Sequence, residues 1–131
     1  MTEKQLVQKA SEARKNSYSP YSSFSVGAAL LTENGECFTG ANIENVSYGL
    51  TSCAERNAFF SAVFNGHRSF TAIAIIGDGK TYLPPCGACR QVMAEFCHKD
   101  FKIILAKNED DYIVKTLDEI LPLSFSEEDM K

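Results

Sequence analysis

Two cysteine-bearing segments constrain the fold of this chain more than any other feature of its sequence. One is Cys53-Ala-Glu55, and the other, 33 residues further on, is Pro85-Cys86-Gly-Ala-Cys89. The sequence predicts that a helix starts at each of them, over residues 53–64 and 86–97. The unpaired N–H groups and the positive dipole of a helix start favour negative charge. A fold in which the two starts converge would therefore place three thiolates in one site.

The number of ligands separates two kinds of zinc site. A structural site has four protein ligands, whereas a catalytic site has three and leaves the fourth position to water. Cys97 and His98 follow Cys89 by eight and nine residues, and His67 lies beyond the far end of the other helix. The helical rise puts these groups roughly 12–20 Å from the clusters. Three ligands with an open position is the favoured interpretation, and Cys37 alone stays open as a fourth ligand.

Glu55 and Arg56 follow the first cysteine directly. A carboxylate two positions after a ligand can reach a metal-activated water without binding the metal, and can carry protons to a leaving group. The alternative is that Glu55 only complements the helix dipole. Three thiolates and Zn²⁺ sum to one negative charge, which Arg56 can balance. Otherwise Arg56 is an ordinary surface arginine.

Hydrophobic patterning predicts an α/β fold. An amphipathic helix is expected over residues 2–16, with Thr2 and Gln5 resembling a capping box. The expected strands cover residues 24–31, 36–42, 71–76, 101–106 and 112–115, and a short last helix covers 117–121. Asn34-Gly35 predicts a hairpin turn between the first two strands. This order indicates a mixed sheet of about five strands with helices on both faces, and one domain over residues 1–131.

Composition limits the classes of partner. The net charge is −4, and the Lys and Arg residues are scattered, so we expect no nucleic acid polymer as a partner. No apolar run approaches the length of a membrane span, and residues 1–8 are polar, so we expect neither a membrane segment nor a signal peptide. Five cysteines, an odd number, argue against a disulfide framework. We therefore expect a cytoplasmic protein that takes a small-molecule substrate.

Longer motifs add a resemblance to a known family. They are Tyr18-Ser-Pro-Tyr-Ser-Ser-Phe24-Ser-Val-Gly-Ala28, Thr39-Gly-Ala-Asn42-Ile-Glu44-Asn45 and Thr51-Ser-Cys53-Ala-Glu-Arg56, followed by Pro85-Cys86-Gly-Ala-Cys89. Together they resemble the small homotetrameric cytidine deaminases of the cytidine and deoxycytidylate deaminase family. The resemblance extends from about residue 5 to Phe125.

The resemblance implies a three-layer α/β/α sandwich with a mixed central sheet. It also implies a hydrolase of pyrimidine salvage that converts cytidine and deoxycytidine to uridine and deoxyuridine with release of ammonia. One Zn²⁺ per subunit would be bound by Cys53, Cys86 and Cys89, and Glu55 would carry protons. Arg56 would balance the charge of the thiolates.

The resemblance also assigns substrate contacts. Asn42 and Glu44 match the ribose contacts, and Phe24 matches the aromatic that packs against the base. Ala54, Tyr48 and Phe125 complete the expected substrate pocket, Phe125 by reaching into a neighbouring subunit of a homotetramer. The chain departs from its relatives in carrying Leu123 where they commonly have Gly, which puts the backbone conformation there in question.

Other functions compete with this one. A related zinc deaminase could act on blasticidin S or on a base in RNA, although Asn42, Glu44 and Phe24 favour a plain nucleoside. A structural zinc module would recruit Cys37 as the fourth ligand. A thiol redox protein would use Cys86 and Cys89, but would leave Cys53 and Glu55 without a role.

Overall fold

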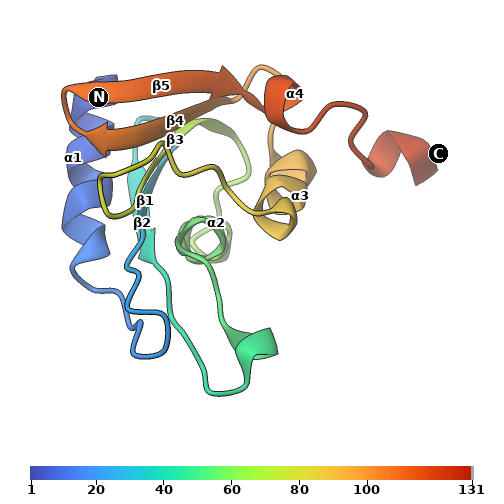
Figure 1. The fold of residues 1–131 in the computed structure, drawn as a ribbon. Coiled ribbons are helices and arrows are strands. Elements are labelled where there is room, and N and C mark those ends of the chain that lie inside the picture. Colours follow the sequence, from blue (N-terminus) through green and yellow to red (C-terminus); the bar gives the residue numbers. More distant parts are fainter. Residues whose placement is uncertain (131) are drawn as a thin grey trace.

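A five-stranded mixed sheet separates helices on its two faces in the computed structural model, which describes residues 1–130 (Figure 1). The strands are β1 (Gly27–Thr32), β2 (Cys37–Ala41), β3 (Phe70–Ile76), β4 (Lys102–Asn108) and β5 (Asp111–Thr116). Their order in the sheet is β2-β1-β3-β4-β5. β1 runs antiparallel to both of its neighbours, β3 and β4 are parallel, and β5 returns antiparallel to β4.

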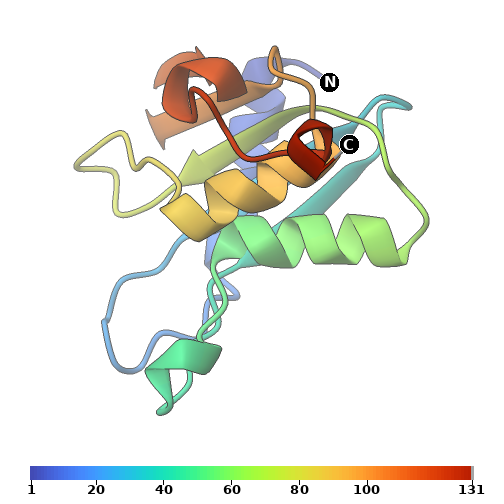
Figure 2. The same ribbon diagram turned by 90° about the vertical axis from the view of Figure 1, so that its right-hand side faces the viewer.

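The helices make the outer layers. α1 (Glu3–Arg14) covers one face of the sheet, while α2 (Ala54–Phe64) and α3 (Gly87–Phe96) cover the other (Figures 1 and 2). α4 (Leu117–Ile120) follows β5, and two 3₁₀ turns, η1 (Tyr48–Leu50) and η2 (Glu127–Met130), lie in connecting and terminal segments. The predicted three-layer α/β/α architecture is confirmed. No helix within residues 1–130 is long and apolar enough to cross a membrane.

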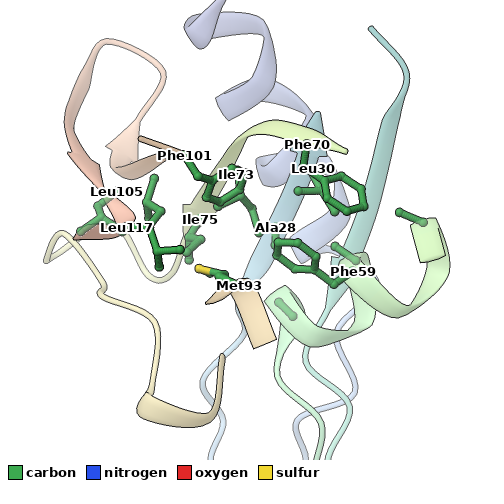
Figure 3. Close-up of a cluster of buried hydrophobic side chains, with 14 residues drawn as sticks. Ala28, Leu30, Phe59, Phe70, Ile73, Ile75, Met93, Phe101, Leu105 and Leu117 are labelled. Atoms are coloured by element: carbon green, nitrogen blue, oxygen red, sulfur yellow. The ribbon is translucent and has the colours of Figure 1, made fainter. Parts of the chain in front are cut away.

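Each face of the sheet has its own hydrophobic cluster. The larger lies between the sheet and the α2–α3 layer, where Phe59 of α2 and Met93 of α3 meet Leu30, Ile73 and other strand residues (Figure 3). The smaller packs α1 against the opposite face through small and branched side chains. β3 and β4 are buried on both faces, and their sequences are therefore continuous apolar runs rather than alternating apolar and polar residues.

Most of the predicted elements are present with shifted ends. The capping box at Thr2 starts α1, and Gly35 takes a φ of 87° in the predicted hairpin turn. The expected strand over residues 24–31, however, begins only at Gly27. Its first residues leave the sheet because the Asn42 side chain bonds the carbonyl of Phe24 and the N–H of Val26.

The starts of α2 and α3 lie side by side on the same face of the sheet (Figure 2). Gly40 of β2 allows the first turn of α2 to lie directly on the strand. A Cβ at this position would be 2.4 Å from the Ala54 carbonyl oxygen and 2.6 Å from the Ala58 nitrogen. A side chain there would therefore displace the helix start that carries Cys53.

Candidate metal centre and catalytic site

Cysteines occupy the N-cap positions of both converging helices. Cys53 caps α2 and Cys86 caps α3, each with extended backbone angles and neither with a hydrogen bond from its side chain to the helix. Ser, Thr, Asp and Asn usually take this position because their side chains bond the free N–H groups. Here the side chains are instead free to turn toward one another, and the third cysteine, Cys89, lies in the first turn of α3.

The three sulfurs form a compact cluster. The Sγ atoms of Cys53 and Cys86 are 3.8 Å apart, those of Cys86 and Cys89 are 3.4 Å apart, and all three lie within 4.8 Å of one another. Zn–S bonds of about 2.3 Å at tetrahedral angles place two sulfurs about 3.8 Å apart. The cluster therefore fits a zinc ion with three thiolate ligands, as the spacing predicts.

The electrostatics of the cluster favour a thiolate at Cys53. A hydrogen bond that Cys89 donates lowers the pKa of Cys53 to about 5, and Arg56 contributes to this shift. The same hydrogen bond raises the pKa of Cys89, because Cys89 must keep its proton in order to donate it. The Nη2 atom of Arg56 donates to the Cys53 sulfur at 3.2 Å. This bond raises the pKa of Arg56 and places its positive charge beside the sulfur cluster.

Glu55 is the one buried carboxyl group within residues 1–130, with 5% of its surface exposed. It lies in the first turn of α2, beside the cysteine cluster. Burial raises the pKa of this carboxyl to about 7, and the neighbouring Cys53 charge acts in the same direction. A carboxyl group with such a pKa can both accept and donate protons near neutral pH.

The remaining cysteines and histidines lie outside this cluster. Cys37 packs with the α1 cluster on the opposite face of the sheet, so it is not a fourth ligand. Cys97 and His67 follow the far ends of α3 and α2, as the helix lengths predict. Within residues 1–130 the metal-binding group thus consists of three cysteines, which leaves one tetrahedral position open.

Asn42 and Glu44 follow β2 and are held next to the cysteine site. Ile43, between them, bridges Tyr18 on one side and Ser52 on the other, and Ser52 precedes Cys53. Both side chains bind the segment of residues 17–26, which we call the polar segment. The structure therefore brings the two expected sugar contacts together and gives each of them partners within the chain.

The other expected pocket residues lie in different places. The half-buried Phe24 ring lies against Gly77, where a Cβ would be 3.1 Å from its Cζ atom, and Ala54 is the fully buried first residue of α2. Tyr48 is 76% exposed in η1. Phe125 is 59% exposed on the C-terminal segment beside α3, where its carbonyl accepts from Gln91. Tyr48 and Phe125 thus present most of their surface to the outside of this chain.

Three polar residues that the sequence did not single out help to build the site. Asn57 donates to the Ala41 carbonyl at 2.7 Å and accepts from the Ser52 hydroxyl at 2.7 Å, which ties α2 to the end of β2. Ser17 and Ser22 bond Asn42 and Glu44. The sequence signal for the serines was only the density of small polar residues in the polar segment, and Asn57 gave none.

Comparison with known proteins agrees with this geometry. The model of the cytidine and deoxycytidylate deaminase zinc-binding region matches residues 1–105, which include all three clustered cysteines. A cytidine deaminase of Halalkalibacterium halodurans is 52% identical over 130 residues, covering 99% of this chain and 98% of the relative. The crystal structure of a cytidine deaminase from Burkholderia pseudomallei superposes with a TM-score of 0.91 at 46% identity, covering 95% of this chain and all of that one. A blasticidin-S deaminase of Bacillus cereus is 29% identical over 77% of this chain and 76% of its own length.

Proposed function

We propose, for a chain that belongs to the cytidine and deoxycytidylate deaminase family, the hydrolysis of cytidine and deoxycytidine to uridine and deoxyuridine with release of ammonia. The observation that carries the proposal is the buried Glu55 carboxyl beside a three-sulfur cluster of zinc dimensions. Such a reaction belongs to the salvage of pyrimidine nucleosides. The cytoplasm, which keeps thiols reduced, is the compartment that suits this site.

Cys53, Cys86 and Cys89 would hold one Zn²⁺ per subunit. A zinc ion with an open position acts as a Lewis acid and lowers the pKa of water enough for attack near neutral pH. Arg56 keeps its guanidinium on the Cys53 sulfur and offsets the charge of the three thiolates. Two helix starts aimed at the same cluster contribute further positive potential.

Glu55 carries the protons of the reaction. It accepts a proton from the attacking water and donates one to N3 of the pyrimidine ring, which makes C4 electrophilic. Once the water oxygen has bonded to C4, its remaining proton passes through the same carboxyl to the amino group, so that ammonia leaves as the C4–N bond breaks and the C4 carbonyl forms. Burial suits Glu55 to this exchange because its pKa of about 7 lies near the working pH.

The free hydrogen-bonding capacity of Asn42 and Glu44 matches a sugar hydroxyl. Asn42 Oδ1 accepts from Ser17 Oγ and from the Val26 N–H, and one N–H of Asn42 donates to the Phe24 carbonyl. The second N–H remains as a donor. Glu44 Oε2 accepts a hydrogen bond from the Ser22 hydroxyl and can accept a further one. One donor beside one acceptor suits a group that both accepts and donates, as a ribose hydroxyl does.

The base would pack on the Phe24 ring, close to the first turn of α2. The backbone N–H of Ala54 belongs to that turn and has no acceptor within the helix, so it is free for a polar atom of the substrate. The pocket would then select a pyrimidine by stacking on one side and by hydrogen bonds at its edge. A phosphate-binding cluster of basic residues is not part of this arrangement.

The exposed aromatic residues support assembly into a homotetramer. Phe60 and Phe64 on α2 are 50% and 89% exposed, in addition to Tyr48 and Phe125. Large exposed aromatics are typical of interfaces between subunits. In the tetramer, Phe125 and Tyr48 would close the pocket of a neighbouring subunit. Analytical ultracentrifugation that finds only monomers would contradict this assembly.

The deciding experiment measures ammonia release from cytidine, deoxycytidine and blasticidin S by zinc-loaded and chelator-treated protein. We expect zinc-dependent turnover of the two nucleosides. Turnover of blasticidin S alone would transfer the assignment to that class of deaminase. No turnover of any of the three compounds by folded, zinc-loaded protein would contradict the proposal and favour a structural role for the zinc.

A further inference from the structure

We propose that Ser22 is a positioning residue that joins Glu44, the expected sugar-binding carboxylate, to Phe24, the expected base-packing aromatic. The inference rests on the proposed function, because the two groups matter together only if one substrate carries both a sugar and a base. Ser22 forms hydrogen bonds with Glu44 and Phe24 and none with the cysteine cluster or Glu55. Its effect would pass through the two residues that it joins.

Ser22 holds both oxygens of the Glu44 carboxylate. Its hydroxyl donates to Oε2, and its backbone N–H donates to Oε1 at 3.1 Å. The Tyr21 N–H adds a second bond to Oε1 at 2.9 Å. These bonds, with the Ser22 hydroxyl as the largest cause, lower the pKa of Glu44 below its usual value. The carboxylate therefore stays charged and keeps one orientation.

The same hydroxyl oxygen also holds the backbone of Phe24. It accepts the Phe24 N–H at 3.0 Å, which closes a turn over Ser23. Ser23 has a φ of 57°, in the left-handed region that residues other than glycine seldom adopt. The bond from Ser22 thus stabilises a strained residue directly before Phe24, and with it the direction in which the chain enters that residue.

The joined groups border the site from two sides. The Phe24 ring lies against Gly77, which follows β3, and the segment of Glu44 is bridged through Ile43 to Ser52, next to Cys53. Ser22 is exposed, so water can replace its hydroxyl at Glu44. A water molecule would not transmit the position of Glu44 to the backbone of Phe24. Loss of the hydroxyl should therefore weaken the recognition of sugar and base as one unit.

The test compares Ser22→Ala with Ser22→Thr, which keeps the hydroxyl. The control is Ser69→Ala, since Ser69 is exposed directly before β3, at the end of that strand opposite Gly77 and outside the polar segment. Cytidine and 2′,3′-dideoxycytidine are compared as substrates and as competitive inhibitors. For cytidine we expect kcat/KM of Ser22→Ala to fall about 10- to 100-fold, mainly through KM, as misplacement of a binding group does. The loss should shrink to a few-fold with the dideoxy compound, while the other two variants stay near wild type.

Equal losses with both compounds, no loss, or a threonine variant as weak as the alanine variant would overturn the proposal. Failure of the wild type to act on cytidine would instead contradict the proposed function. In that case amide hydrogen exchange measured by NMR decides the structural role. Ser22→Ala should speed exchange of the Phe24 amide and leave that of Val26, which Asn42 holds, unchanged. Unchanged exchange at Phe24 would overturn the inference.

Discussion

The metal cluster and the polar segment lie beside each other but are held by different means. The cysteines are fixed by two long helices that pack on a shared hydrophobic core. The polar segment of residues 17–26 has no strand or helix, and single side chains such as Asn42 and Ser22 hold it through hydrogen bonds. The metal cluster should therefore tolerate the loss of one polar contact, whereas the polar segment should respond to it strongly.

The largest effect is expected at Glu55. Glu55→Gln keeps the shape of the buried side chain but removes its ability to carry protons, so kcat for cytidine should fall by about 10²- to 10⁴-fold. Zinc content, measured by atomic absorption, should remain at one ion per chain. A variant with normal turnover would exclude Glu55 as the proton carrier. Loss of zinc would instead make it part of the metal-binding structure.

Gly40→Ala tests how the first turn of α2 is placed. The added Cβ would meet backbone atoms of α2 rather than a movable side chain. Overpacking of this kind destabilises a protein by about 1–3 kcal/mol, and the melting temperature should fall by several degrees. Gly49→Ala is the matched control, because a Cβ there has no atom within 4 Å. Equal melting temperatures for the two variants would contradict the close contact.

Asn42→Ala should separate the two regions. The change leaves the Phe24 carbonyl and the Val26 N–H without their partner, which should cost about 1–3 kcal/mol in the free energy of unfolding. KM for cytidine should rise, while zinc content stays at one ion per chain. Urea denaturation and metal analysis measure both quantities. Simultaneous loss of zinc would show that the metal cluster depends on the polar segment, and would contradict the view that the two regions are held independently.

Arg56→Gln removes the positive charge from the Cys53 sulfur. Loss of such a supporting contact typically weakens metal affinity by about 10- to 100-fold, which competition with a chelator can measure. Arg68→Gln serves as the control, since Arg68 donates to the backbone carbonyls of Val63, in the last turn of α2, and of His67, far from the cluster. If both variants bind zinc equally well, the charge of Arg56 has no role at the cluster.

The smallest effect is expected at Leu123. Its φ is 54° and its side chain is fully exposed, so Leu123 holds a left-handed backbone conformation at the surface without contacts that would offset the strain. Leu123→Gly should stabilise the chain by at most about 1 kcal/mol, because relief of strain is partly offset by backbone entropy. Leu123→Ala, which keeps the strain, should not be stabilising. Thermal denaturation compares the two.

The sequence by itself predicted the cluster of three cysteines, the place of Glu55 at the start of α2 and the main elements of the fold. Cysteines at two helix starts and uninterrupted apolar runs can both be recognised from local sequence, because a helix start favours thiolates and a strand buried on both faces carries apolar side chains. The prediction that a strand begins at residue 24 was wrong because of a tertiary contact. The Asn42 side chain, which is 16 and 18 residues further along the chain, bonds the N–H of Val26 and the carbonyl of Phe24.

Only the tertiary structure decided how the sugar side of the site is built. Short polar side chains such as Ser22 and Asn57 can form hydrogen bonds with many partners, and the sequence does not show which partner each side chain binds. The register of β1 on β2 and the bridge from Ile43 to Ser52 bring segments 22 residues apart into contact, and so select Glu44 as the partner of Ser22. Hydrogen bonds are short and directional, so their partners are fixed only once the fold has set the distances.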